Sequence, residues 1–476
     1  MFDSEFAGAD DAAVVAAIEE NNRAEAVAGA RRLAAIAELA RRRVDDEDDE
    51  QARWVFDGWA SAAAEVGAAM TVGHRRASGQ MRIAVALRDR LPRVAALYLQ
   101  GAINSRVVST ITWRTQLVDD GEALALIDAA LADTAARWGT LSEQKLDDAI
   151  DARIDRFDPD AVRRTESSTR SRDFSIGDLD DPAGVTSVWG RLLATDAAVL
   201  KGRIAAMVAA VCDADPRSAG ERRADAVSAL LAGSDKLGCA CGSDTCPAVG
   251  ARPASSVVVH VIAEQQAVAA ATPSPDDSAA KPPATPSAAL IVGGTVLPAA
   301  VLKEVIGGGA RVTPISMPAN DPEPHYRPSA GLAQFVRMRD LFCRAPGCDV
   351  SADRCDVDHT IPYPIGPTHA SNLKCLCRTH HLSKTFGGWD DVQLPNGTVV
   401  WTSPSGRSYT TKPGSLLFFP TWDATTANLP PPPTVVPPSA CRALKMPTRR
   451  RTRAADDTAR IKAERAQNKA AAHAPF

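Results

Sequence analysis

Aromatic side chains are scarce in this sequence of 476 residues: they make up 5% of the total, and 4 of them are tyrosines. An aromatic-rich β-sandwich is therefore disfavoured, whereas the abundant alanine favours helices that pack closely together. Hydrophobic residues at 45% and charged residues at 24% are typical of globular proteins. The length predicts two to four folding units, because one unit usually takes roughly 100–200 residues.

Long apolar runs are also missing. No stretch approaches the roughly 18 apolar residues of a membrane-spanning helix. The segment from Met1 to Glu5 carries two acidic residues rather than the basic segment of a signal peptide. We therefore expect a cytoplasmic protein without a membrane partner. In a reducing compartment, clustered cysteines bind metal more often than they form disulfides.

The net charge of −4 is small, but it is unevenly distributed. Residues 441–476, called the tail below, hold ten lysines and arginines against three acidic residues, a net charge of +7, so residues 1–440 carry −11. A basic arm beside an acidic body is typical of a segment that contacts a polyanion. A solvated tail without a partner has the same composition, and charge alone leaves both interpretations open.

The hydrophobic pattern divides the chain into four parts. Helical periodicity dominates residues 1–160, and residues 161–320 alternate between strand and helix patterns, with a Pro-rich loop at 267–288. Residues 325–415, called the C-terminal module below, contain a helix, a cysteine and histidine cluster and a hairpin signal. We expect residues 416–476 to be a Pro-rich linker and a basic disordered tail. The fold class is thus a mainly α N-terminal region with an α+β part, followed by a small module.

Within residues 1–160, each helix is expected to bury one apolar face. The expected helices span 9–43, 50–70, 78–90, 92–101, 105–117, 121–137 and 141–157. Pro92 suits a first helical turn and Ser142 suits an N-cap. In the C-terminal module, Pro395-Asn396-Gly397 predicts the turn of a hairpin.

Two ligand pairs in the C-terminal module predict a zinc site. Cys343 and Cys348 lie on either side of a Pro-Gly turn, and Cys377 and His380 are spaced to share one face of a helix. Four ligands complete a tetrahedral zinc site without an open position, so this zinc would be structural. Reduced core cysteines are the alternative interpretation.

The residues between these pairs predict a second, catalytic locus. Adjacent histidines on a helix point about 100° apart, so His380 and His381 are better assigned to two different sites. Asp358 could join His381 as a ligand to a divalent ion such as Mg²⁺, and His359 could act as the general base. Asn372 could orient His359 through its amide.

These residues resemble the motif of HNH endonucleases. The longer string from Asp340 through His381 to Trp389 is similar to bacterial HNH proteins whose N-terminal region is the domain of unknown function 222. The resemblance implies a zinc-stapled ββα-metal fold over the C-terminal module. It also implies that His359 is the general base, Asn372 the middle residue of the motif, and His381 and Asp358 the metal ligands.

We therefore expect a metal-dependent endonuclease that hydrolyses phosphodiester bonds in DNA, with Lys384 and Arg378 as phosphate contacts. The alternative is a non-catalytic DNA-binding or regulatory protein that uses the zinc-stapled module as a platform. A helical interaction protein with a zinc ribbon is a third interpretation, but it leaves the Asp358-His359 pair unexplained.

The remaining cysteines and histidines have less specific patterns. Cys239, Cys241 and Cys246 offer three thiolates without an obvious fourth ligand, apart from the distant His260, so a second zinc site and a plain loop both remain possible. Cys212 and Cys441 are expected to be inert thiols. Cys355 and Cys375 are expected to be buried filler, and His369 a surface residue.

Overall fold

The computed structural model describes most of the chain. The described residues are 5–45, 47–138, 141–162, 173–177, 181, 184–243, 245–246, 260–272, 289–292, 296–307, 310–430 and 446–472. They form two compact units, one made of residues 1–164 and 314–476 and the other of residues 165–313. No helix in the described part is both long enough and apolar enough to cross a membrane.

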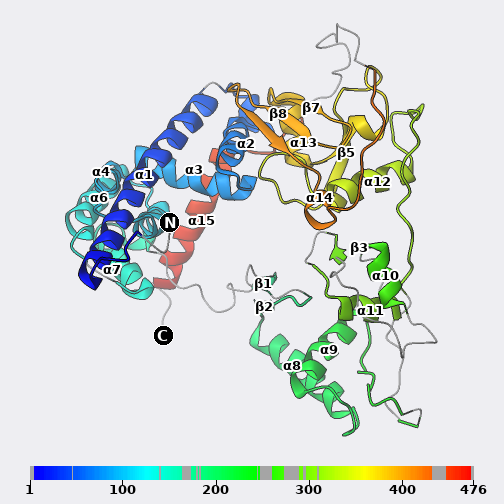
Figure 1. Ribbon diagram of the computed structural model, residues 1–476. Helices are drawn as coiled ribbons and strands as arrows, with labels where there is room; N and C mark the ends of the chain where they lie inside the picture. The colour runs from blue at the N-terminus through cyan, green and yellow to red at the C-terminus, as the bar shows by residue number, and fades with distance from the viewer. Residues whose placement is uncertain are drawn as a thin grey trace. The chain divides into compact units, whose positions relative to one another are not determined.

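The N-terminal part of the first unit is helical, as the sequence predicts (Figure 1). Its helices are α1 (Asp11–Asp45), α2 (Gly58–Met70), α3 (His74–Asp89), α4 (Pro92–Leu99), α5 (Ser105–Arg114), α6 (Gly121–Ala135) and α7 (Glu143–Phe157). Pro92 occupies the first turn of α4, and the Ser142 side chain accepts a hydrogen bond from the Lys145 backbone at the start of α7. Both helix-start predictions are confirmed.

Small residues allow these helices to approach closely. Their core combines buried alanines from α1, α2 and α3 with larger apolar side chains such as Met81, Ile111 and Ile127. At Gly29 of α1, an added Cβ would overlap the buried Tyr98 hydroxyl of α4. Glycine is therefore required where these two helices meet. The abundance of alanine and the scarcity of aromatic residues reflect this packing.

The second unit contains short strands and helices in alternation. Its elements are β1 (Asp173–Ile176), β2 (Val188–Arg191), α8 (Ala194–Ala209), α9 (Ala219–Leu231), β3 (Val261–Ala263), α10 (Gln265–Ala271), β4 (Ala289–Ile291) and α11 (Ala299–Gly307). β1 pairs with β2 and β3 with β4, both antiparallel. The predicted loop at 267–288 is corrected at its start, because residues 267–271 belong to α10; residues 273–288 lie outside the described residues.

The C-terminal module consists of short helices and two small antiparallel sheets. Its elements are α12 (Ala330–Asp340), β5 (Cys355–His359), β6 (Leu373–Cys377), α13 (Arg378–Phe386), β7 (Asp390–Gln393), β8 (Val399–Thr402) and β9 (Ser408–Thr411), and α14 (Ser415–Phe418) begins at its last residue. β5 and β6 form an antiparallel pair that leads directly into α13. The predicted hairpin is formed by β7 and β8, and β9 extends it to three strands.

This module shares its core with the N-terminal helices. Ala64 and Ala68 of α2 are buried in the same cluster as Phe335, Trp401 and the cysteines of the module. At Gly347, with φ of +71°, an added Cβ would lie 2.8 Å from the Val72 carbonyl oxygen. The turn between α2 and α3 therefore supports the module from outside its own sequence.

The tail contains a helix that packs onto the N-terminal helices, where the sequence predicted disorder. α15 (Arg453–Ala472), red in Figure 1, lies beside residues 115–117 and 159–161 of the helical region. Arg465 forms ion pairs with Asp158 (2.6 Å) and Asp119 (3.2 Å). The prediction of a disordered tail is wrong for residues 453–472, because basic residues of the tail pair with acidic residues of the helical region.

A second ion-pair group holds the start of α15. Asp57, which is nearly buried and caps α2, forms ion pairs with Arg449 (2.7 Å) and Arg453 (3.0 Å). The Arg449 backbone also donates to the Arg53 carbonyl. These arginines are committed to the protein itself, so they are not free to bind a polyanion.

Replacing Arg453 with alanine is expected to loosen α15. Both guanidinium hydrogen bonds to Asp57 would be lost, at about 1–3 kcal/mol for bonds between charged groups. Hydrogen exchange over residues 453–472 measures this local opening. The exposed Arg450 provides the matched control, since Arg450→Ala is expected to change the opening free energy by less than about 0.5 kcal/mol. Equal exchange in the two variants would contradict the ion-pair clamp.

Candidate functional site

The four zinc ligands predicted from the sequence converge. The Sγ atoms of Cys343, Cys348 and Cys377 and a ring nitrogen of His380 all lie within 4.8 Å of one another. His380 Nδ1 lies 3.2 Å from Cys377 Sγ and 3.6 Å from Cys343 Sγ. Three thiols and one imidazole at such distances can hold a metal ion, and this donor set is typical of structural zinc.

Local backbone structure presents each ligand. The Cys343 N–H donates to the Val350 carbonyl and the Cys348 N–H to the Ala345 carbonyl, which closes the turn between the two thiols. Cys377 is the last residue of β6 and the N-cap of α13, so His380 lies one turn along the helix on the same side.

Buried charged residues of α12 hold β6 in place. Arg339 is fully buried and donates to the carbonyls of Ala370 and Leu373 at the start of β6. Asp340 accepts the backbone N–H of Cys375 at 2.8 Å. These bonds fix the strand that carries Cys377.

The two neighbouring cysteines lie outside the ligand group, as expected. Cys355 donates to the Ser351 carbonyl, and Cys375 is fully buried against α12. The expectation of a surface position for His369 is wrong: it is 2% exposed, and its Nδ1 accepts the Ser371 N–H. His369 caps the short turn before β6, a role that its position in a loop did not indicate.

The second histidine of α13 faces a different site, as the helical geometry predicts. His381 Nδ1 lies 2.9 Å from Asp356 Oδ2, and its Nε2 lies 3.3 Å from Asp358 Oδ1. Asp356 and Asp358 are two positions apart in β5, so their side chains share one face of the strand, and both lie within reach of the His381 ring. The hydrogen bond that the His381 ring donates to Asp358 raises the pKa of His381 above its ordinary value, against the opposing effect of burial.

Two lysines that the sequence did not single out as neighbours surround Asp358. Lys384 Nζ lies 2.7 Å and Lys374 Nζ 3.7 Å from its Oδ2 atom. Lys374 is fully buried and pairs with Asp391 (2.5 Å), and burial lowers its pKa to about 8. Burial by itself would raise the pKa of Asp358, but the bond from His381 and the two lysines outweigh it and lower that pKa. Asp358 is therefore held as a carboxylate.

His359, the last residue of β5, is 5% exposed and stacks on an aromatic ring. Its ring centre lies 5.4 Å from that of Tyr326, with 14° between the planes. His359 Nε2 lies 2.9 Å from the Thr368 hydroxyl. Burial lowers the pKa of His359, and the nearby Asp358 offsets only part of this effect. The imidazole is therefore neutral at neutral pH.

Asn372 does not orient His359 through its amide, and this expectation is corrected. Its Oδ1 accepts the Ile361 N–H, and its Nδ2 donates to the carbonyls of Ile361 and Pro367. The amide therefore closes the loop that follows His359. Asn372 acts on the site by fixing this loop, which also carries Thr368.

The two expected phosphate contacts differ in availability. Arg378 is 63% exposed and has one long ion pair, 3.7 Å to Asp356. The Lys384 side chain is 13% exposed and bonds Asp358 and the His359 carbonyl. Arg378 remains a candidate contact, whereas Lys384 is occupied within the site.

Among the described residues, two groups of three or more cysteine, histidine or acidic side chains could hold a metal ion. One is the group of Cys343, Cys348, Cys377 and His380, and the other lies in the second unit. Asp358 and His381 are adjacent, but they form a pair rather than a third group. A catalytic metal there would need further ligands from solvent or substrate.

The raised pKa of His381 predicts a pH-dependent contribution to stability. This contribution is complete below about pH 6.5, the ordinary histidine pKa, and is lost as the pH rises through the raised folded-state pKa. The measurement is the difference between the free energies of unfolding of the wild type and His381→Asn as a function of pH, with zinc retained and no magnesium added. The difference should shrink as the pH rises above 6.5; a difference that grows would contradict the interpretation.

Sequence comparisons match most of the chain to known relatives. The model of the family "Domain of unknown function (DUF222)" matches residues 20–340. Uncharacterized protein Rv3776 of Mycobacterium tuberculosis is 56% identical over 430 residues, which cover 88% of this chain and 83% of the relative. Uncharacterized protein Rv2100 of the same organism is 52% identical over 449 residues, covering 88% of this chain and 82% of the relative. No solved structure matches. The chain therefore belongs to the DUF222 family.

Proposed function

We propose that this protein is a metal-dependent endonuclease of the HNH type that hydrolyses phosphodiester bonds in DNA. The observation that carries the proposal is the pairing of His381 Nε2 with Asp358 Oδ1 at 3.3 Å, next to the neutral His359. All three residues lie on the β5 and α13 elements of one β-strand–β-strand–helix unit, whose base is the four-ligand zinc group.

Asp356 supports the role of His381 as a metal ligand. Its carboxylate accepts a hydrogen bond from Nδ1. If a metal ion replaces the Nε2 proton that His381 shares with Asp358, the remaining proton stays on Nδ1 and the Nε2 lone pair is available to the ion. A carboxylate behind a histidine ligand orients the ring in this way at many metal sites. A magnesium or other divalent ion there would neutralise the charge that develops on the scissile phosphate.

The environment of His359 suits a general base. The Thr368 hydroxyl donates to the Tyr326 carbonyl, so its oxygen accepts a hydrogen bond from His359 Nε2. Nδ1 is then the nitrogen without a proton, and it is the atom that would accept the proton of the attacking water. A base must be unprotonated at the working pH, as the lowered pKa of His359 provides.

The remaining residues divide between positioning and substrate contact. Asn372 fixes the loop that carries Thr368, and Lys384 holds Asp358. The exposed Arg378 is assigned to contact the DNA phosphates. The structural role proposed for the zinc is to hold α13, and with it His381, against β6.

The test is a nicking assay on supercoiled plasmid DNA with the full-length protein. Nicked product is expected with Mg²⁺ or Mn²⁺ and not when these ions are omitted while zinc is retained. Binding to DNA without cleavage under every divalent ion would favour the alternative of a non-catalytic binding platform and would refute the nuclease.

A further inference from the structure

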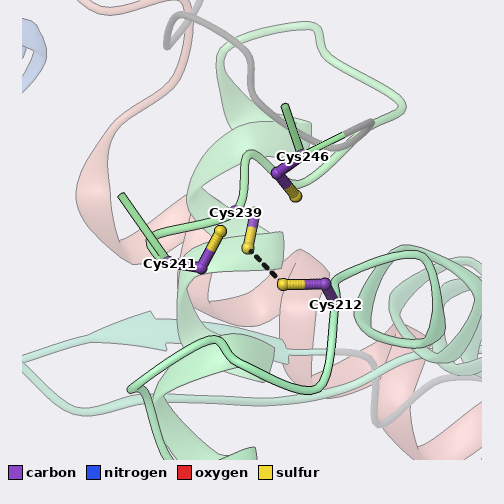
Figure 2. A group of neighbouring side chains, drawn as sticks. All are labelled: Cys212, Cys239, Cys241 and Cys246. Carbon is purple, nitrogen blue, oxygen red and sulfur yellow. Dashed lines mark hydrogen bonds between the residues drawn. The ribbon is translucent and has the colours of Figure 1, made fainter. Parts of the chain in front are cut away.

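We infer that Cys212, Cys239, Cys241 and Cys246 bind a structural zinc ion in the second unit. The four side chains come from two loops and point toward one another (Figure 2). Cys212 lies just beyond α8, and the other three follow α9. In this proposal Cys212, which the sequence suggested to be an inert thiol, takes the place of the distant His260 as the fourth ligand.

The spacing of the sulfur atoms suits tetrahedral coordination. Zinc–sulfur bonds of about 2.3 Å place the four sulfurs of such a site roughly 3.8 Å apart. All four Sγ atoms lie within 4.8 Å of one another, and Cys212 and Cys239 are 3.3 Å apart. Only small side-chain rotations separate this arrangement from a closed site.

Hydrogen bonds that do not involve sulfur bring the two loops together. Asp215, close after Cys212, accepts the Ala240 N–H at 2.9 Å. Arg217 donates to Asp215 (2.7 Å) and to the Gly238 carbonyl (2.7 Å). The backbone on either side of Cys239 is therefore held against the loop of Cys212 by hydrogen bonds in which no thiol takes part. The hydrogen bonds between the two loops therefore bring the cysteines together.

The packing around the group explains why a metal would be needed. The buried apolar residues between α8 and α9 are few: Met207, Val211, Ala226 and Leu237. Such a small core contributes little stability, and small units commonly gain the remainder from a structural metal. A zinc ion would tie the end of α8 to the segment after α9.

A disulfide between Cys212 and Cys239 is the competing state. It would need an oxidant and would leave Cys241 and Cys246 as thiols beside it. A zinc ion uses all four sulfurs and requires no oxidant. The arrangement of four converging thiols therefore favours the metal.

Metal content of the full-length protein, purified without chelator, tests the inference. We expect two equivalents of zinc per chain in the wild type and one in Cys212→Ser, whereas Cys375→Ser, which changes a buried cysteine outside both groups, keeps two. Cys348→Ser removes the other equivalent, so loss at the two sites is distinguishable. One equivalent in the wild type, retained in Cys212→Ser, would overturn the inference.

Thiol alkylation provides a readout that does not depend on a variant being folded. In the wild type, the four cysteines should resist alkylation until zinc is chelated and then react fully without a reducing agent. If Cys212 and Cys239 react only after reduction, they form a disulfide and the zinc site is refuted.

Discussion

Replacing His359 with alanine is expected to lower the rate of plasmid nicking by about 10²–10⁴-fold, the usual contribution of a general base. His359 Nδ1 would no longer be present to accept the proton of the attacking water. The initial rate of nicked-product formation in Mg²⁺ measures the effect, at protein concentrations at which the wild type converts only a small fraction of the DNA.

Stability must be measured beside activity, because His359 is buried and stacked on Tyr326. His359→Asn, which retains a polar side chain at the site, provides a second variant, and His325→Ala changes an exposed histidine of the same module. We expect His359→Asn to be as inactive as the alanine variant and His325→Ala to nick at the wild-type rate. Wild-type nicking by folded His359→Ala would contradict the assignment.

Replacing Cys377 with serine is expected to have the largest effect on stability. Its thiol belongs to the ligand group of Cys343, Cys348, Cys377 and His380. Binding of structural zinc contributes on the order of 10 kcal/mol to the stability of small zinc domains. The variant should lose one equivalent of zinc. The free energy of unfolding of the module should fall by several kcal/mol. Fluorescence of Trp389 and Trp401, both buried in the module, follows its unfolding.

Cys375→Ala is the matched control, because it removes a fully buried thiol two residues away that is not a ligand. It should keep its zinc and lose only about 1–2 kcal/mol, as usual for a small core truncation. If Cys377→Ser and Cys375→Ala were equally stable and bound equal amounts of zinc, Cys343, Cys348 and Cys377 would be core residues rather than ligands.

Features encoded locally could be predicted from the sequence. The helices of residues 1–160 follow from apolar periodicity and from start residues such as Pro92 and Ser142. The hairpin of β7 and β8 follows from Pro395-Asn396-Gly397, and the zinc group from two closely spaced ligand pairs. Each helix, the hairpin turn and each ligand pair depend on residues only a few positions apart, whose geometry a single helix or turn determines. The meeting of the two ligand pairs is inferred from their type and number and not from local geometry.

Features that depend on tertiary proximity could not be predicted. Lys374 lies in an apolar strand and Asp391 in a separate hairpin, and only the fold pairs them beside Asp358. Cys212 is 27 positions from Cys239 and has no ligand spacing to it. The charge of the tail was visible, but its partners Asp57 and Asp158 are some 300 to 400 positions away. Composition therefore indicated a disordered arm where the structure has a docked helix.

The division of the chain into units has a consequence for the order of folding. The first unit is made of residues 1–164 and 314–476, so its two segments are separated by the whole second unit. During synthesis, α2 and Asp57 emerge long before the module that shares their core and before α15. The second unit is continuous in sequence and can fold first, whereas the first must keep exposed apolar surface until its later segment arrives. The surface of α2 around Ala64 and Ala68 therefore stays exposed on the nascent chain until the module that covers it has been made.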